Sequence, residues 1–166
     1  EASDALRRVI GDPNPDFILG FGSQINVGKF SFGFLFESVQ GVDVFDADKR
    51  TRQGVGIGEF AEQELSGELP RGWIWSIYPI EEWRMSDGSF TKLRELTLSY
   101  TFDKLFDGAL NNTVLTVGGR NLFSFDNFTS FDPEVNAGGQ SNLLRGVNFG
   151  QVPIPRVYTV TLKTNF

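Results

Sequence analysis

The chain has no cysteine and no histidine among its 166 residues. Without cysteine it forms no disulfide and offers no thiolate, so it gives no direct sign of an oxidising or a reducing compartment. Without histidine it lacks the commonest general base and the commonest transition-metal ligand of proteins. These two absences remove the side chains on which many enzyme and metal sites depend.

Positive charge and long apolar runs are also scarce. Lysine and arginine total 15 against 21 acidic residues, which gives a net charge of −6. Because nucleic-acid-binding proteins expose basic surface, this balance argues against a nucleic-acid partner. No run approaches the roughly 18 apolar residues of a membrane-spanning helix. Membrane strands escape that test, since every second residue of such a strand is polar. The first ten residues do not resemble a signal peptide, and no motif indicates a cofactor.

Phenylalanine and glycine are abundant, with 17 and 19 residues, against a single methionine. This composition is typical of strand-rich proteins with many turns. Five stretches alternate between apolar and polar residues with period two, and this pattern predicts strands. They cover about residues 16–27, 29–40, 91–102, 113–122 and 156–166. Several exceed the five or six residues usual in soluble strands and match the roughly 9–11 that cross a bilayer.

Each predicted strand has a mostly apolar face and a mostly polar face. The second strand places four phenylalanines on one face, an arrangement that suits a wall with hydrocarbon on one side and water on the other. A soluble β-sandwich accounts for one such strand but poorly for all five. The predicted membrane-facing residues are Phe30, Phe32, Phe34, Phe36, Leu96, Leu98, Tyr100, Phe102, Tyr158, Val160 and Leu162. The terminal Phe166 is expected to carry the insertion signal of the last strand.

The connections between these strands alternate between short and long. Residues 41–90 and 123–155 form the long ones, which we expect to be extracellular loops, because barrel turns on the periplasmic side are short. Five strands cannot close a barrel, and an open edge in lipid leaves backbone groups unpaired. The sequence therefore predicts an all-β chain that is the carboxy-terminal, five-stranded segment of a larger antiparallel transmembrane β-barrel.

Several segments, in order, support a more specific interpretation. They are Asn14-Pro15-Asp16-Phe17, the stretch from Phe90 to Tyr100, Gly119-Arg120-Asn121-Leu122-Phe123, Phe131-Asp132-Pro133-Glu134, and Pro155-Arg156 before the last strand. Together they resemble the carboxy-terminal part of the SusC/RagA family of TonB-dependent outer-membrane transporters of Bacteroidetes. The third segment followed by the fourth is the most specific signal among them.

The resemblance implies a barrel of about 22 strands, of which these are the last five, with an amino-terminal plug in its lumen. It implies the cell outer membrane as location and the import of oligosaccharides or oligopeptides. It also implies several partners: the rest of the barrel and its plug, a SusD-like surface lipoprotein acting as a lid, TonB, the barrel assembly machinery and outer-membrane lipid. The plug and the TonB box are not in this chain.

Four aromatic residues of the first long loop are candidates for substrate or lid contact. They are Trp73, Trp75, Tyr78 and Trp83. Aromatic faces stack on sugar rings and on apolar peptide side chains, and they are enriched at protein interfaces. The alternative is that these rings pack the loop against itself or against neighbouring loops.

Two groups of acidic residues invite a chemical interpretation. Asp43, Asp46 and Asp48 have the oxygen ligands that calcium prefers, but the glycine and distal glutamate of an EF-hand loop are missing. A solvated loop is the simpler interpretation, and we predict no metal site. The glutamates 59, 62, 64, 81 and 82 could supply the paired carboxylates of a glycosidase. Nothing in their spacing sets a pair at catalytic separation, so we predict that the chain is not an enzyme.

Three alternatives to a transporter segment stay open at this stage. A soluble β-sandwich that binds carbohydrate through its tryptophan loop predicts solubility without detergent. A β-structured glycosidase predicts loss of turnover on substitution of Glu81 and Glu82. A SusC-like protein that serves as a non-transporting scaffold in an assembly or secretion complex differs only in its plug, its TonB box and its partners.

Overall fold

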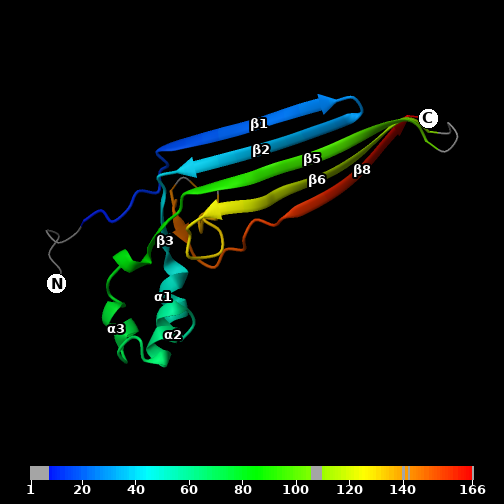
Figure 1. Cartoon of the computed structure of the whole chain (residues 1–166). Coiled ribbons are helices and arrows are strands. Elements are labelled where there is room, and N and C mark those ends of the chain that lie inside the picture. The colour runs from blue at the N-terminus through cyan, green and yellow to red at the C-terminus, as the bar shows by residue number, and fades with distance from the viewer. Residues whose placement is uncertain (1–7, 106–109, 140, 142, 166) are drawn as a thin grey trace. The chain divides into compact units, whose positions relative to one another are not determined.

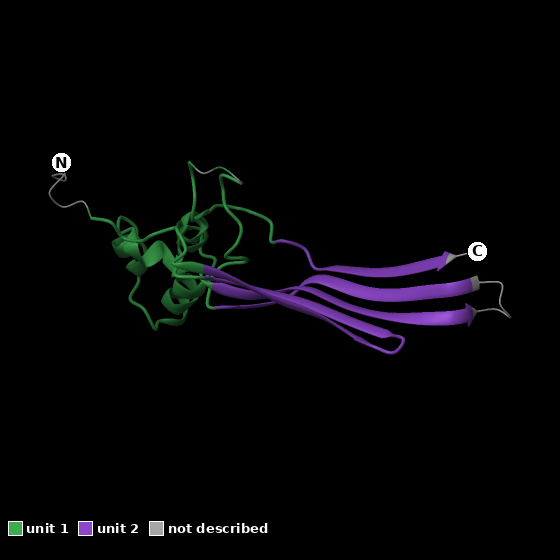
Figure 2. Cartoon of the chain, turned by 90° about the horizontal axis from the view of Figure 1, so that it is seen from above, with its two compact units in different colours: residues 1–17, 40–89, 127–153 green, residues 18–39, 90–126, 154–166 purple. Residues whose placement is uncertain are grey.

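The computed structural model describes residues 8–105, 110–139, 141 and 143–165, and the chain divides into two compact units (Figure 2). The sheet unit comprises residues 18–39, 90–126 and 154–166, and the lobe comprises residues 1–17, 40–89 and 127–153. The predicted insertion signal, Phe166, lies outside the described residues. None of the helices in the described ranges is long and apolar enough to cross a membrane.

Five long strands form one sheet in the order β1-β2-β5-β6-β8 (Figure 1). They are β1 (Phe17–Val27), β2 (Phe30–Gln40), β5 (Phe90–Leu105), β6 (Leu110–Asp126) and β8 (Val157–Asn165). The pairs β2–β5, β5–β6 and β6–β8 are antiparallel. The predicted all-β, antiparallel barrel segment is therefore confirmed as the fold class of this chain.

The turn between β1 and β2 shows how tightly these strands are joined. Only Gly28 and Lys29 separate the two strands, and Gly28 has a positive φ of 58°. Glycine suits this position because it lacks the Cβ that makes the left-handed region unfavourable for other residues. The two-residue turn matches the short connection expected from the sequence.

The strand register places the apolar residues of neighbouring strands on one face. Phe32 pairs with Leu98, Leu98 pairs with Val117, and Val117 pairs with Val160. Directly paired residues lie on the same face of a sheet. The phenylalanine row of β2 is continuous, with neighbouring ring centroids 5.9 Å apart from Phe32 to Phe34 and from Phe34 to Phe36. The sheet therefore has one apolar face that runs across at least four strands.

β5 and β6 are longer than the alternation predicted, with 16 and 17 residues. An irregularity interrupts their pairing, because Leu93 opposes Phe123 while Glu95 opposes Arg120. Asn121 occupies the irregularity with a φ of 52°, a left-handed value that asparagine tolerates better than most residues. Such bulges are local features that let a strand bend without losing its partner.

The two long connections fold into the lobe instead of remaining irregular. The first contains β3 (Asp43–Asp46), α1 (Ala47–Gly54), α2 (Glu59–Ser66), α3 (Trp73–Ile77), a 3₁₀ turn η2 (Glu82–Arg84) and β4 (Met85–Asp87). The second contributes β7 (Val147–Asn148). These strands make a small sheet in the order β4-β3-β7, in which β3 and β7 run parallel.

The interior of the lobe is held by polar groups as much as by apolar ones. Asp46 is fully buried at 0% exposure, and its carboxylate accepts hydrogen bonds from the Arg52 guanidinium at 2.7 Å and the Asn148 side chain at 3.1 Å. It also accepts from the backbone N–H of Lys49, which caps the start of α1. The Asp46 carboxylate thus connects the first long connection to Asn148 of the second, 102 positions further along the chain.

Candidate functional site

The apolar face of the sheet is open in this chain. Phe30 is 55% exposed, Leu98 50%, Val117 51% and Tyr158 74%. A soluble sandwich buries such a row beneath a second sheet. Here the four side chains are exposed and form a wide apolar surface. Monomeric soluble proteins rarely expose a contiguous surface of this kind.

The opposite face of the same strands is polar and closely packed. The hydroxyls of Ser99 and Thr116 lie 2.8 Å apart on paired strands, and Arg120 approaches Glu95 at 3.8 Å. A Cβ added at Gly33 would lie 2.7 Å from the Thr97 hydroxyl oxygen, so the backbone there admits no larger residue without a shift. The face therefore has hydroxyl and charged groups that pair with one another and suit contact with water or a polar surface.

Two long strands, β1 and β8, form the edges of the sheet. Every residue of β1 is exposed, and so are the residues of β8 from Val157 to Lys163. An edge strand presents unpaired N–H and C=O groups that template pairing with another strand. β1 has no proline and no charged residue, and β8 has a single lysine, Lys163, so both edges have little of what blocks such pairing in soluble proteins.

The four aromatic candidates of the first long connection have different environments. Trp75 is 65% exposed, and its ring lies 5.2 Å from that of Tyr78. Trp73 shares α3 with Trp75 and is 37% exposed. Trp83 instead donates its indole N–H to the carbonyl of Ile77 at 2.8 Å and lies 5.9 Å from the Phe60 ring. The structure thus brings Trp75 and Tyr78 together and places Trp83 in a packing role.

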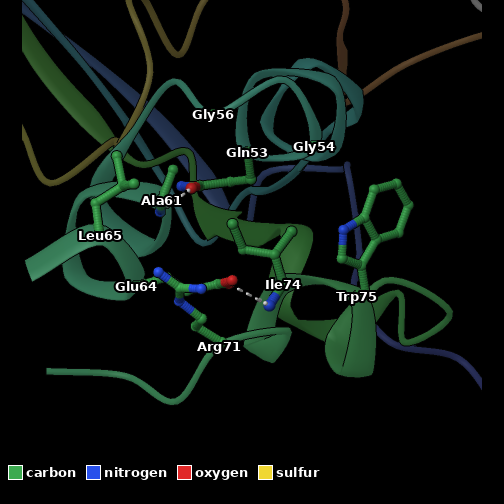
Figure 3. A pocket seen from close by; sticks show the side chains of 9 residues that line it. All are labelled: Gln53, Gly54, Gly56, Ala61, Glu64, Leu65, Arg71, Ile74 and Trp75. Atoms are coloured by element: carbon green, nitrogen blue, oxygen red, sulfur yellow. Dashed lines mark hydrogen bonds between the residues drawn. The ribbon is translucent and has the colours of Figure 1, made fainter. Parts of the chain in front are cut away.

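A hollow of about 290 Å³ lies among α1, α2 and α3, next to Trp75 (Figure 3). Its walls combine apolar side chains with the guanidinium of Arg71 and the carboxylate of Glu64. Glu64 accepts hydrogen bonds from the backbone N–H groups of Gly72 and Ile74, at 2.7 and 3.2 Å. The hollow draws on three helices that the strand pattern did not reveal, so sequence reasoning missed it.

The three aspartates considered for calcium are engaged separately. Asp46 holds the buried network described above, Asp48 accepts from the backbone N–H of Gly150 at 2.6 Å, and Asp43 accepts from the backbone N–H of Asp12 at 3.0 Å. Within the described ranges, no three acidic residues are grouped in a way that would hold a metal ion. Asp43 and Asp48 thus fix loop backbone, whereas Asp46 caps α1 and binds two side chains.

The glutamates considered for glycoside hydrolysis are likewise occupied by neighbours. Glu82 forms an ion pair with Arg8 at 2.8 Å, and Glu81 pairs with Arg84 and lies 3.8 Å from Arg50. The pKa of Glu82 is lowered, first by its own backbone N–H and then by Arg8. A general acid needs the opposite shift, a raised pKa. These carboxylates therefore serve as ion-pair partners within the lobe.

Arg84 and Arg50 form the electrostatic centre of this part of the lobe. Burial lowers the pKa of Arg84, and the nearby Arg50 guanidinium lowers it further. The Arg84 guanidinium lies 4.3 Å from the Phe45 ring centre, and that of Arg50 lies 3.9 Å from the Tyr78 ring centre. Cation–π contacts of this kind stabilise desolvated guanidinium groups. Tyr78, and through it Trp75, is thereby fixed in place.

Asn121 belongs to the sequence segment that carried the most specific resemblance. Its amide oxygen accepts from Arg94 at 3.4 Å, and its amide nitrogen donates to the carbonyl of Pro155 at 3.4 Å. Arg94 also pairs with Glu37. The asparagine thus fixes a bulge in β6 and the backbone just before β8, which gives the segment a physical role that strand alternation did not disclose.

The chain is similar to known proteins in sequence and in fold. No protein-family model matches it. TonB-dependent receptor P3 of Formosa agariphila is 26% identical over the whole chain, and TonB-dependent receptor P26 of the same organism is 28% identical over 95% of it. Each alignment covers 18% of the relative, so the chain spans less than a fifth of the length of these proteins.

Solved structures of a RagAB peptide importer share the fold. The open-open state superposes with a TM-score of 0.73 at 19% identity and covers the whole chain and 19% of the importer chain. A further RagAB peptide transporter structure gives a TM-score of 0.72 at 20% identity, with the same coverage of both chains. The sequence-based resemblance to SusC/RagA-type TonB-dependent transporters is confirmed. The relatives are receptors and an importer, and none of those compared is named as an enzyme.

Proposed function

We propose that this chain is part of the membrane wall of a TonB-dependent outer-membrane importer. The observation that carries the proposal is the continuous apolar face of the five-stranded sheet, which stays exposed while the opposite face has paired hydroxyl and charged groups. In a membrane barrel the apolar face contacts lipid and the polar face contacts the lumen. The similarity to TonB-dependent receptors supports the same assignment.

Strand length supports a spanning role. β1 and β2 have 11 residues each and β8 has nine, which fits the roughly 9–11 residues that cross hydrocarbon. β5 and β6, with 16 and 17 residues, extend further. At about 3.3 Å per residue, their five or six extra residues continue the wall by about 15–20 Å outside the membrane.

The two edge strands indicate what completes the wall. Unpaired backbone groups in hydrocarbon destabilise a protein by several kcal/mol each, so β1 and β8 each require another strand of the same barrel. With the two-residue turn at Gly28 in the periplasm, residues 41–89 and 127–153 emerge on the extracellular side, where long loops are expected. The barrel assembly machinery and outer-membrane lipid are then partners of the whole protein.

The whole protein also requires a cargo and further partners. We assign the whole protein to import of oligopeptides or oligosaccharides, driven by TonB through a plug, with a SusD-like lipoprotein as lid over the extracellular lobe. The exposed Trp73 and Trp75 support a contact role for that lobe, because large aromatic side chains are enriched at interfaces. Trp83 packs inside the lobe and supports its shape.

Site-specific fluorescence in lipid tests the wall assignment directly. Single cysteines are placed in the full-length protein at Phe32, Leu98 and Val117, and as matched controls at their neighbours Ser31, Ser99 and Thr116, and each is labelled with an environment-sensitive fluorophore. After reconstitution, brominated lipid should quench the first three and leave the controls bright. Equal quenching of both sets would overturn the proposal.

Import is tested separately in cells. Uptake of labelled oligopeptide by cells expressing the full-length protein should require TonB and should stop when the plug's TonB box is deleted. Uptake that continues without TonB would remove the importer assignment while leaving the wall assignment intact.

A further inference from the structure

The hollow beside α3 has an apolar floor and one aromatic wall (Figure 3). Ala61 and Ile74 are buried at its base, while Leu65 is 84% exposed and Trp75 65% exposed at its rim. The volume of about 290 Å³ lies near the lower limit of ligand pockets, about 300 Å³, and suits a group the size of one or two amino-acid residues. A ligand that covers this exposed apolar rim removes apolar surface from water, which is favourable for binding.

Among the described residues, the side-chain oxygens that line the hollow already accept hydrogen bonds. Gln53 accepts from the backbone N–H of Ala61 at 3.0 Å, and Glu64 accepts from those of Gly72 and Ile74. Arg71 lines the same hollow, and among the described residues it makes no hydrogen bond or ion pair. The hollow therefore offers an incoming molecule one unpaired positive charge and few other free polar groups.

The aromatic wall is held in position before any ligand arrives. The Tyr78 ring lies between two groups. Its centre is 5.2 Å from that of the Trp75 ring and 3.9 Å from the Arg50 guanidinium. Glu64 fixes the start of α3, the helix that carries Trp75. A preorganised wall loses little conformational entropy on binding, which favours affinity.

We propose that this hollow binds the carboxyl terminus of a peptide whose last side chain is apolar. The planar guanidinium of Arg71 pairs with the two oxygens of the terminal carboxylate, and the side chain packs against Leu65, Ile74 and Trp75. Arginine is well suited to such a two-point contact with a carboxylate. The assignment of the peptide as transported cargo rests on the proposed function, whereas the binding itself does not.

A sugar ring fits the same hollow less well. Trp75 can stack on a sugar face, but each hydroxyl of a bound saccharide needs a hydrogen-bond partner or loses free energy on leaving water. The side-chain oxygens of Gln53 and Glu64, which could accept from sugar hydroxyls, already bind backbone N–H groups. The terminal carboxylate of a peptide requires only Arg71, so the available chemistry favours the peptide.

Binding measurements on the purified full-length protein in detergent test the site. One probe is a short peptide that ends in leucine with a free carboxylate, and the other is the same peptide with a carboxy-terminal amide. Binding of each peptide is measured by calorimetry or by tryptophan fluorescence. The free acid should bind at least about tenfold more tightly than the amide, because only the acid engages Arg71 as an ion pair. Arg71→Gln should remove this preference, and Arg71→Lys should retain part of it.

Two controls make the result specific. Arg156→Gln removes an exposed guanidinium outside the hollow and should leave the preference for the free acid unchanged. Trp75→Leu should weaken binding of both peptides by a similar factor. Equal affinity for acid and amide, or a preference that survives Arg71→Gln, would overturn the proposal. Tight binding without uptake of the peptide would leave the site standing and count against import of this cargo.

Discussion

The sheet and the lobe of this chain are stabilised by different means. The sheet repeats one rule over five strands: apolar residues on one face, small and hydroxyl residues on the other. The lobe has few buried apolar side chains, among them Val44, Ala61 and Ile74, and depends on buried polar residues such as Asp46 and Asn148. Many interchangeable contacts hold the first region, whereas a few particular residues hold the second.

The largest expected effect comes from placing a charge on the wrong face of the sheet. Val160 and Thr161 are neighbours on β8, both are exposed, and they lie on opposite faces. Val160→Arg should destabilise the membrane-inserted protein by about 2–4 kcal/mol, because the charge enters hydrocarbon. Thr161→Arg is the matched control and should have little effect, since Lys163 already occupies that face. Folding titrations into lipid vesicles measure the difference, and equal destabilisation would contradict the assignment of faces.

In the lobe, the corresponding weak point is a single carboxylate. Asp46→Ala should destabilise the lobe by about 2–3 kcal/mol, because Arg52 and Asn148 lose a buried charged acceptor. Hydrogen exchange should rise at residues 44–53 and stay unchanged at residues 96–102. Glu68→Ala, on an exposed residue of the same lobe, is the control. An equal rise in hydrogen exchange at residues 44–53 and 96–102 would mean that the sheet depends on Asp46 as much as the lobe does.

Close packing on the polar face gives a smaller effect. Gly33→Ala should destabilise the sheet by about 1 kcal/mol, because the new methyl group would lie 2.7 Å from the Thr97 hydroxyl oxygen. Gly20→Ala is the matched control, since a Cβ at Gly20 meets nothing within 4 Å. Combining Gly33→Ala with Thr97→Ala should relieve the loss. Strictly additive effects of the two substitutions in equilibrium unfolding would refute the contact.

The smallest expected effect is a loss of lobe stability at acid pH. The pKa of Glu82 lies below its ordinary value of 4.5, and the pKa of Asp12 is lowered by hydrogen bonds from Asn14. A lowered folded-state pKa contributes stability above the unfolded value, and that stability is lost as the pH falls through the folded pKa. Exchange of amides near residues 8–14 should therefore increase below about pH 4.5. Arg8→Gln should weaken the response by removing the ion pair of Glu82.

The two regions also differ in how far reasoning from the sequence reached. The apolar face shared by Phe32, Leu98 and Val160 follows from period-two alternation and was predicted, whereas the residue-by-residue pairing was not. The bulge at Asn121 and the extension of β6 to Asp126 were not, because a bulge depends on side-chain contacts such as those with Arg94. The phenylalanines 123 and 125 consequently join a strand that was expected to end at Leu122.

The lobe was expected to be two long loops with candidate aromatic residues. Trp75 and Tyr78 do form a pair, in which Trp75 is exposed and Tyr78 is half-buried, and Trp83 is packed through its indole N–H. The hollow and Arg71 escaped notice, since an arginine without a partner looks like any other arginine in a sequence. Only the positions of three short helices show that the oxygens of the neighbouring Gln53 and Glu64 are occupied, while Arg71 has no partner in the part of the chain that the structure describes.

The sequence by itself determined the strands, their faces and the family resemblance, because alternation is a local property and each residue's side of a strand follows from its parity. The tertiary structure alone decided how Asp46 reaches Asn148, where Asn121 interrupts a strand and which cation lines the hollow beside Trp75. Those outcomes depend on contacts between residues far apart in the chain, and their geometry exists only once both long connections have folded.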